Sequence, residues 1–334
     1  MKLKQFFLLA ALGLTASATL TSCEDILGHW EKPTPVTPTP SGSEEESVPG
    51  LLTGKFTINA EGKKVRFSQG NLQATYDGSE WTWKFAEHQW DYIGNAEGNT
   101  KVSGTAPFVA GYTGTSTTVD LFGWVGASNT TWTGAAMYGI TNSTTSTDYG
   151  NGTSDALKSD WGTLAITNGG NTENFGWHTL TGGDDGEWKY LLSTRTTGGT
   201  VFGTAQARYA HATINTDIAS GVNGIILFPD GVDIADSEVT TAGTVNGNSV
   251  WGTKCTSAEW TALEAKGCVF LPAAGSRGGD SVYTVGSDGG YWSSTADGAG
   301  SAYGVYFFSS SMAPGDGNYN YNVGFSVRLV RPVE

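Results

Sequence analysis

Basic residues are scarce in this 334-residue chain, and their scarcity excludes two kinds of partner. The chain has 18 Lys and Arg against 32 Asp and Glu, a formal net charge of −14. Proteins bind nucleic acids mainly through lysine and arginine side chains that neutralise phosphates, and anionic membranes attract similar basic patches. We therefore expect no nucleic-acid partner and no electrostatic docking on a membrane.

Motifs for metal binding and nucleophilic catalysis are also missing. The four histidines, His29, His88, His178 and His211, are scattered, and no two have the spacing of metal ligands on one helix. No Gly-x-Ser-x-Gly sequence occurs, and we interpret Gly275–Gly278 as a turn. The sequence predicts no metal, no cofactor and no enzymatic activity.

Two groups of carboxylates leave a hydrolase as an alternative. Three carboxylates lie within Asp184–Glu187 and three within Asp230–Asp236. A glycosidase needs two facing carboxylates, but a helix cap and a loop explain these residues more simply. The segment Asp316–Asn320 resembles the start of an EF-hand loop, yet it lacks Gly at the sixth position and Glu at the twelfth. We predict no calcium site.

Residues 1–22 have the pattern of a signal peptide. Lys2 and Lys4 precede the apolar run Phe6–Leu14, which is too short to span a bilayer. The sequence Leu20–Cys23 resembles a bacterial lipobox, in which Cys23 is lipidated and becomes the mature N-terminus. This resemblance implies a lipoprotein of the outer membrane or cell surface, attached to the membrane by the lipid on Cys23.

Residues 23–50 then carry the lipidated cysteine and a tether rich in Pro, Thr and Glu. Alternating Pro and Thr favour an extended polyproline conformation, and the run Glu44–Glu46 repels itself. Twenty residues at about 3.1 Å each hold the following domain up to roughly 60 Å from the lipid.

Residues 51–334 have the composition of one globular domain. The whole chain has 38% hydrophobic residues and 12 Trp, and its Gly and Pro content is below the roughly 25–30% typical of low-complexity chains. A hairpin is predicted around Glu61-Gly62, and a strand at Trp81–Phe85. Buried strands are predicted at Gly224–Phe228 and Cys268–Leu271, and long loops with little regular structure at 100–175.

Two helices are predicted from their N-terminal capping patterns. Asp184–Glu187 precedes one helix, and Thr256–Glu259 precedes the other, which Gly267 ends. Each helix contains Glu-Trp-x-x-Leu, which places Trp and Leu on one buried face. Cys255 and Cys268 flank the second helix, which is about 15 Å long, so a disulfide requires the chain to fold back beside it. The sequence leaves that pairing open.

The C-terminal region alternates between structural and exposed character. Tyr291–Thr295 is aromatic and rich in hydroxyls, and Phe325–Leu329 alternates apolar and polar residues like a half-buried strand. In an intervening strand Tyr303, Val305 and Phe307 share one side. The segment 315–322 is too polar and turn-rich for a core. Exposed Tyr, Phe, Ser, Asp and Asn side chains typically form contact surfaces.

The two ends of this region resemble a known family. YWSST at Tyr291–Thr295 and GFSVRLVR at Gly324–Arg331 resemble the C-terminal part of formylglycine-generating-enzyme-like C-type-lectin domains. GKFTINAEGKKVRFSQGNLQ at 54–73 and WKFAEHQWDYIG at 83–94 resemble bacterial surface lipoproteins of that branch. The resemblance implies an α+β, C-type-lectin-like fold of the sulfatase-modifying-factor type, with two helices, short antiparallel strands and long loops.

The resemblance carries the fold and not the oxidase activity. The enzymes of the family rely on a reactive cysteine pair near the C-terminal motif, whereas Gly275–Glu334 contains no cysteine. Arg328 and Arg331 are functional candidates by charge alone. We predict instead that Arg328 is structural and connects the terminal strand to the loops that support the binding face.

Some lipoproteins of this branch are variable proteins of diversity-generating retroelements. There, mutation of template adenines turns asparagine positions into Tyr, Ser, Asp, Gly, Ala, Phe or Val. The positions that carry such residues here are Gly298, Gly300, Ser301, Gly304, Tyr306, Phe308, Ser311, Ala313, Asp316, Gly317 and Asn318. A fixed polar loop in an undiversified relative is the open alternative.

The sequence thus predicts a binding protein that presents residues 297–322 to an extracellular protein or glycan. The alternatives are a glycan-binding lipoprotein with a fixed site and, third, a surface glycoside hydrolase. The predicted ligand-binding residues are Asp297, Ser301, Tyr306, Phe308, Ser311, Asp316, Asn318, Tyr319, Asn320, Tyr321 and Asn322.

Overall fold

The structure is a computed structural model that describes residues 48–77, 79–95, 97–100, 117–126, 132, 134–150, 160–169 and 176–333. The chain divides into two compact units, Met1–Glu45 and Glu46–Glu334, and every described residue belongs to the second. The predicted signal peptide, the lipidation site Cys23, His29 and the tether up to residue 47 lie outside the described residues. Much of the predicted loop region 100–175 also lies outside them.

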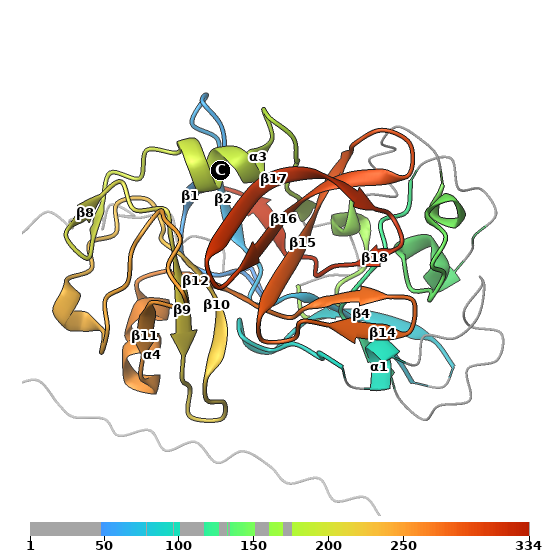
Figure 1. Cartoon of the computed structure of the whole chain (residues 1–334), viewed down its shortest axis with the longest axis horizontal. Helices are drawn as coiled ribbons and strands as arrows, with labels where there is room; N and C mark the ends of the chain where they lie inside the picture. The colour runs from blue at the N-terminus through green and yellow to red at the C-terminus, as the bar shows by residue number, and fades with distance from the viewer. Residues whose placement is uncertain are drawn as a thin grey trace, which may run out of the picture. The chain divides into compact units, whose positions relative to one another are not determined.

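Small sheets of short, mostly antiparallel strands dominate the described residues, and helices are few, so the class is mixed α+β (Figure 1). Two sheets have four strands each. The first has the order β1 (Phe56–Thr57), β2 (Lys64–Phe67), β19 (Leu329–Pro332), β6 (His178–Thr179). The second has the order β11 (Thr253–Cys255), β9 (Tyr209–Ile214), β10 (Val222–Leu227), β12 (Val269–Pro272). Two three-stranded sheets have the orders β4 (Trp81–Phe85), β3 (Leu72–Tyr76), β5 (Thr117–Val119) and β14 (Ser281–Tyr283), β13 (Ser276–Gly278), β18 (Val323–Gly324). Another three-stranded sheet has the order β15 (Asp288–Ala296), β16 (Ser301–Phe308), β17 (Ser311–Asn320). A two-stranded sheet pairs β7 (Thr200–Val201) with β8 (Thr204–Ala205).

The helical elements of the described residues are short. The α-helices are α1 (Glu97–Thr100), α3 (Glu187–Lys189) and α4 (Ser257–Ala265), and α3 continues as the π-helix η4 (Tyr190–Thr194). The 3-10 helices are η1 (Gly134–Tyr138), η2 (Ser146–Tyr149), η3 (Trp161–Thr163) and η5 (Asp236–Glu238). None of the helices in the described ranges is long and apolar enough to cross a membrane.

Several predicted elements are confirmed. The hairpin around Glu61-Gly62 is β1 paired with β2, and the strand Trp81–Phe85 is β4. The two predicted buried strands are β10 and β12, which pair antiparallel at the centre and edge of one sheet. Their apolar runs are buried on both faces, as continuous hydrophobic strands usually are.

Helix α4 has the predicted capping box. The Thr256 hydroxyl accepts from the Glu259 amide at 3.4 Å, and the Glu259 carboxylate accepts from the Thr256 amide at 2.7 Å. Gly267 follows the helix with a φ of +86°, a conformation that glycine adopts without strain. Trp260 and Leu263 are both buried, which confirms the buried face.

Helix α3 begins differently from the prediction. Its N-cap is Gly186, whose residue type has no side chain to accept from the first turn. Thr181 takes that role: its hydroxyl accepts from the Glu187 amide at 3.0 Å, and the Glu187 carboxylate accepts from the Thr181 amide at 3.0 Å. The reciprocal pair therefore spans six residues, and the expectation of a cap by Asp184 or Asp185 is wrong. Trp188 is buried as predicted.

The sheet β15–β16–β17 lies between two parts of the core. Val305 and Phe307 pack in one apolar cluster together with Trp188. Trp292 and Ala302 belong to another cluster. β16 is the central strand of this sheet (Figure 1). The outer side of β15 forms bridges with Gly275 and Ser326, so β17 is the open edge strand.

The terminal segment is more deeply buried than its alternation predicts. All residues from Phe325 to Leu329 are at most 1% exposed, so the expectation of a half-buried strand is wrong. The reason is that the segment forms bridges on two sides, Phe325 with Phe122 and Ser326 with Tyr291.

Two buried arginines organise the region around this segment. Arg328 is structural, as predicted, but its guanidinium donates to Asn71 and Gln89, both at 3.3 Å, and not to loops of the predicted binding face. Arg277 lies in strand β13, so the predicted turn at Gly275–Gly278 is wrong. Its side chain is 1% exposed and donates to main-chain carbonyls of three separate segments.

Cys255 and Cys268 are buried in one apolar cluster as free thiols. Burial raises the pKa of the Cys255 thiol to about 12 and raises the pKa of the Cys268 thiol as well. Both side chains therefore act as small apolar core residues in this structure.

Candidate functional site

The region 297–322 is mainly a β-hairpin and not a set of loops. β16 and β17 pair antiparallel from Ser301↔Asn320 to Phe308↔Ser311, so the expected loop at 315–322 is a strand over most of its length. The Gly, Asp and Asn residues of β17 have low strand propensity. Pairing with the rigid strand β16 supplies the backbone hydrogen bonds and overrides that preference.

The predicted ligand-binding residues divide into three groups by exposure. The exposed ones are Phe308, Asp316, Asn318 and Asn320. The half-buried ones are Asp297, Ser301, Tyr306, Ser311, Tyr319 and Asn322. Tyr321 is fully buried. The hairpin therefore brings ten of these eleven side chains at least partly to the surface.

A bulge in β17 projects its polar side chains. Two residues, Gly317 and Asn318, oppose the single residue Tyr303 between the pairs Gly304↔Asp316 and Ala302↔Tyr319. Asn318 has a φ of +65°, which asparagine tolerates better than most residues. The main-chain amide of Asn318 donates to the Asp297 carboxylate at 2.7 Å. The Asp297 side chain thus positions the bulge.

Tyr306 and Tyr319 form an aromatic group with Phe325 on the face toward the core. The ring centroids of Tyr306 and Tyr319 are 6.0 Å apart, and the Tyr319 ring is 5.1 Å from that of Phe325. The Tyr306 hydroxyl donates to the Asp288 carboxylate at 2.6 Å. Burial and this carboxylate raise the pKa of Tyr306 to about 12. Both tyrosines are half-buried and therefore partly structural.

Tyr321 does not face solvent, so the expectation of an exposed aromatic there is wrong. Its ring stacks on Trp124 with centroids 4.6 Å apart, and its hydroxyl donates to the Gly298 carbonyl at 3.2 Å. Its amide donates to the Gly300 carbonyl at 2.9 Å. Tyr321 therefore holds the turn at 298–300 and the end of the hairpin to the core.

The serines at the starts of β16 and β17 each form a hydrogen bond with another segment. The Ser301 hydroxyl donates to the Asp297 carbonyl at 2.5 Å. The Ser311 carbonyl lies 3.1 Å from the His211 ring nitrogen Nε2. His211 is buried, and burial lowers its pKa, so the hairpin tip contacts a buried imidazole.

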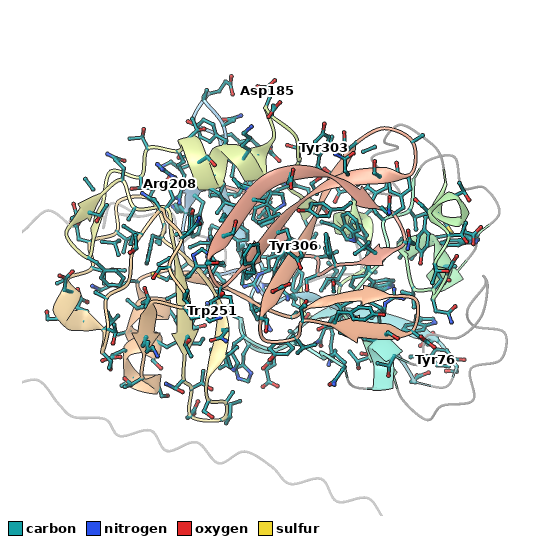
Figure 2. The ribbon with its side chains drawn as sticks, viewed as in Figure 1. Tyr76, Asp185, Arg208, Trp251, Tyr303 and Tyr306 are labelled. Atoms are coloured by element: carbon teal, nitrogen blue, oxygen red, sulfur yellow. The ribbon has the colours of Figure 1, made fainter. Side chains whose placement is uncertain are left out.

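Tyr303 lies partly at the surface, whereas Val305 and Phe307, predicted on the same side of the strand, are buried. It is half-buried and lies beside Gly182 and Gly183, where a Cβ at Gly182 would come within 2.4 Å of the Tyr303 Cβ (Figure 2). A hydrogen bond with the Asp297 carboxylate raises the pKa of Tyr303. The alternation along the strand gave no signal for this position, because it does not distinguish Tyr303 from Val305 and Phe307.

Trp251 is a second residue without a signal in the sequence. Its half-buried ring is 5.8 Å from that of His211, beneath the hairpin tip. Figure 2 shows Trp251 and Tyr306 in the same region of the molecule. An aromatic residue from a distant segment thus adjoins the candidate face.

The carboxylates of the hydrolase alternative have structural partners. Asp230 accepts from Arg195 at 2.8 Å, from the Thr57 hydroxyl at 2.6 Å and from the Thr57 amide at 3.0 Å. Asp184 pairs with Lys189, and Asp233 accepts from an amide of β7. Asp230 and Asp233 therefore join separate chain segments, and Asp184 pairs within its own part of the chain.

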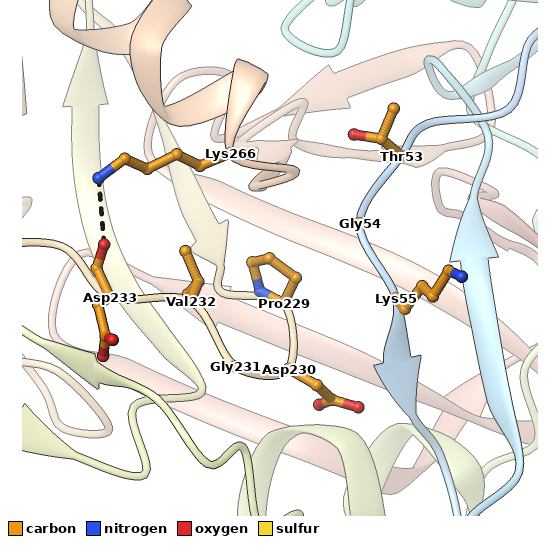
Figure 3. Close-up of a pocket in the computed structure, with 9 residues that line it drawn as sticks. All are labelled: Thr53, Gly54, Lys55, Pro229, Asp230, Gly231, Val232, Asp233 and Lys266. Carbon is orange, nitrogen blue, oxygen red and sulfur yellow. Dashed lines mark hydrogen bonds between the residues drawn. The ribbon is translucent and has the colours of Figure 1, made fainter. Parts of the chain in front are cut away.

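Asp230 and Asp233 line an open pocket of about 460 Å³ (Figure 3). Lys266 reaches across it and donates to the Asp233 carbonyl at 3.1 Å. Lys55 lines the opposite side in Figure 3. The pocket carries both signs of charge. Asp230 pairs with Arg195 and Lys266 with Glu238, and neither partner lines the pocket.

No group of three His, Cys, Asp or Glu side chains within the described ranges is placed to hold a metal ion. No protein-family model, curated protein or solved structure matches the chain. The face formed by β16, β17 and the turn before them is therefore interpreted from its own geometry. It combines a fixed backbone with polar and aromatic side chains that point outward.

Proposed function

We propose that this chain is a lipid-anchored surface protein that binds an extracellular protein or glycan through the hairpin face of residues 297–322. We also propose that residues 51–334 have a C-type-lectin-like fold. The support for the lipid anchor is the lipobox resemblance at Cys23. The support for the fold is the combination of α+β class, small antiparallel sheets and the sequence resemblance.

One observation carries the binding proposal. The two ends of the C-terminal region, Tyr291–Thr295 and Gly324–Arg331, pair with each other in the core. The main-chain amide of Trp292 donates to the carbonyl of Ser326 at 3.0 Å. The segment between them turns outward as the hairpin. Asp316 and Asn320 are exposed there, so neither is needed for packing. A scaffold that is closed at both ends and exposes polar side chains between them suits ligand contact.

A variant set tests the face directly. The triple variant Phe308→Ala, Asp316→Ala, Asn320→Ala removes three exposed side chains and keeps the hydrogen bond between Asp297 and the main-chain amide of Asn318. The matched control is Ile218→Ala, Asp217→Ala, Asn95→Ala, three exposed residues on other elements. The wild-type chain is screened against arrays of surface proteins and glycans, and both variants are then compared on each hit.

We expect the face variant to lose at least tenfold in affinity, because exposed aromatic and polar contacts dominate such interfaces. The control variant should bind like the wild type. Equal binding by all three proteins would refute the proposed face. Sequencing the gene's surroundings tests the diversification hypothesis separately: a reverse transcriptase and a near-repeat that differs only at adenines would support it.

A further inference from the structure

The segment 247–251, which we call the strap, is held to the rest of the protein mainly at its two ends. Before it, the Asn246 amide donates to the Tyr209 carbonyl at 2.9 Å, and after it, Thr253 pairs with Ala212 of β9. Between these points no main-chain hydrogen bond joins the strap to another strand or helix of the described ranges. Segments with few backbone hydrogen bonds are the first to open locally.

The closed position of the strap depends on the packing of one ring. Trp251 is half-buried against the apolar cluster that contains Ile225 and Phe307, whereas Val250 beside it is 71% exposed. Trp251 has a φ of +40°, in the left-handed region that a bulky side chain rarely adopts. Asn246 before the strap has a φ of +55°, which asparagine tolerates better. The closed strap therefore stores backbone strain that opening releases.

His211 lies between the strap and the hairpin tip. Its ring is 5.8 Å from that of Trp251, and its Nε2 atom is 3.1 Å from the Ser311 carbonyl oxygen. The main chain of Gly247 and of Phe308 also adjoins the ring. The side chain is 0% exposed. Two segments that are far apart in the sequence thus cover one imidazole.

The two ring nitrogens of His211 differ in what they can bind. A carbonyl oxygen only accepts, so Nε2 carries the hydrogen of the neutral ring and donates to Ser311. An additional proton must go to Nδ1, which is buried. Gly247 and Phe308 adjoin the ring, but no acceptor of the described residues lies in hydrogen-bonding geometry with Nδ1. A charged ring in the closed structure would therefore carry a buried, unpaired N–H group.

The segments packed around the ring carry no charge that would offset a proton. Residues 222–227 of the paired strand β10, residues 245–251 and residues 308–312 contain no Asp, Glu, Lys or Arg. On β9 itself the titratable neighbour is Tyr209, with 6.0 Å between the ring centroids, and burial raises its pKa. That phenol is therefore neutral at any pH at which His211 titrates.

Charged residues of the neighbouring strands have other surroundings. Asp288 in β15 pairs with Phe308 and accepts from the Tyr306 hydroxyl at 2.6 Å. Lys254 in β11 is exposed. Neither charge counters burial, which lowers the pKa of His211 from its usual 6.5. The closed strap thus favours the neutral ring over the charged one.

We propose that protonation of His211 opens the strap, which moves away from the ring so that Nδ1 reaches water. The strap moves and the hairpin tip stays, because the tip is held by the pairing of β16 with β17 and the charged ring still donates to Ser311. Opening exposes the ring of Trp251 beside the hairpin tip. This switch does not depend on which ligand the hairpin face binds.

The direction of the pH dependence follows from the two states of the strap. In the open state the imidazole is in water and has the ordinary histidine pKa of about 6.5. In the closed state its pKa is lower. The open state therefore binds the proton first as the pH falls, and the closed state loses stability relative to it below about pH 6.5.

Hydroxyl-radical footprinting of the full chain tests the switch, with labelling of each tryptophan read by mass spectrometry at about pH 7.5 and about pH 5. Labelling of Trp251 is divided by that of Trp81, a half-buried tryptophan of β4, to correct for radical dose. The test variant is His211→Gln, whose amide can donate to Ser311 but takes up no proton. The matched control is His88→Gln, which removes a half-buried histidine elsewhere.

We expect the relative labelling of Trp251 to rise about threefold or more at the lower pH in the wild type and in His88→Gln, and to change less than about 1.5-fold in His211→Gln. No rise in the wild type, or an equal rise in His211→Gln, would overturn the proposal. Trp292 is fully buried and reports global unfolding. A parallel rise there would show that acid unfolds the whole domain, which also overturns a local switch.

Proton NMR of the wild type supplies a check that needs no variant. The ring resonances of His211 should titrate with a midpoint below about pH 6.5, and the labelling of Trp251 should rise over the same pH range. A midpoint at or above about pH 6.5, or labelling that rises in a different range, would refute the coupling between the proton and the strap.

Discussion

Arg277 offers the sharpest test of how the region behind the hairpin is held together. Its guanidinium donates to the carbonyls of Leu121 at 3.1 Å, Thr141 at 2.5 Å, Gly279 at 2.9 Å and Gly139 at 3.2 Å. These carbonyls come from separate segments, and no carboxylate of the described residues pairs with the arginine. The side chain thus joins main-chain segments that no other described side chain reaches together.

The perturbation is Arg277→Met, which keeps much of the side-chain volume and removes all donors. A hydrogen bond to a charged group contributes about 1.5–3 kcal/mol, and a buried carbonyl without a donor costs about 1–3 kcal/mol. The desolvation of the buried guanidinium offsets part of this gain. We expect the free energy of unfolding to fall by about 3–5 kcal/mol, because four buried carbonyls lose a donor and the relieved desolvation cost offsets only part of that loss.

Arg277→Lys retains the charge but presents donors from a single nitrogen atom, so it can reach fewer of the four carbonyls. We expect its free energy of unfolding to fall by about 2–3 kcal/mol, between the methionine variant and the wild type.

The control is Lys84→Met on the exposed side of β4, whose free energy of unfolding is expected within about 0.5 kcal/mol of the wild type. Urea unfolding followed by tryptophan fluorescence measures all four proteins. A loss below about 1 kcal/mol for Arg277→Met would refute this account of the arginine.

Three further predictions follow from individual side chains. Tyr321→Ala should cost about 3–5 kcal/mol in urea unfolding and Asn320→Ala less than about 0.5 kcal/mol, because only the tyrosine is buried; equal costs would contradict the assignment. Burial raises the pKa of Asp120 from 3.8 to about 6, so the folded state binds more protons than the unfolded state between those values. The contribution of Asp120 to stability should therefore fall by about 3 kcal/mol as the pH rises through this window and stay constant above it. A carbon NMR titration midpoint for Asp120 below pH 4 would contradict this. Cys255 and Cys268 should react with maleimide only after unfolding, because burial raises the pKa of both thiols; rapid labelling of the native protein would show an open core.

The sequence predicted the elements whose signals are local. The capping box of α4 needs only Thr256 and Glu259, and both hydrogen bonds are present. The hairpin around Glu61-Gly62 depends on one turn and two short apolar runs. Continuous apolar segments at β10 and β12 predicted strands buried on both faces. In each case the residues that decide the structure lie within a few positions of one another.

The errors occur where distant segments decide the outcome. β17 has the composition of a loop, and its strand exists because β16 supplies the hydrogen bonds. Arg277 has no local signal for burial, since its carbonyl partners lie up to 156 residues away in the sequence. The cap of α3 by Thr181 is also hidden, because a six-residue spacing is not that of a capping box.

The same distinction applies within the candidate face. From sequence, Tyr319 and Tyr321 are two similar residues of one polar run. In the structure the first is half-buried, and the second is fully buried and stacks on Trp124. The buried ring of Tyr321 contributes to stability and holds the end of the hairpin to the core. Asp316 and Asn320 are exposed, so their side chains are available for contact with a ligand.

Backbone contacts set a further limit on which positions of the hairpin can vary. A Cβ at Gly304 would come within 2.8 Å of the Tyr291 carbonyl oxygen, which is main chain and fixed by pairing with β16. A Cβ at Gly317 would come within 2.3 Å of the Asp297 carboxylate, a side chain that can rotate away at the cost of its bond to the Asn318 amide. Asp316 and Asn320 meet neither restriction. We therefore expect amino-acid variation to be tolerated at the exposed positions beside the bulge in β17 and not along the whole segment 297–322. At those positions a different side chain extends into solvent without displacing the backbone.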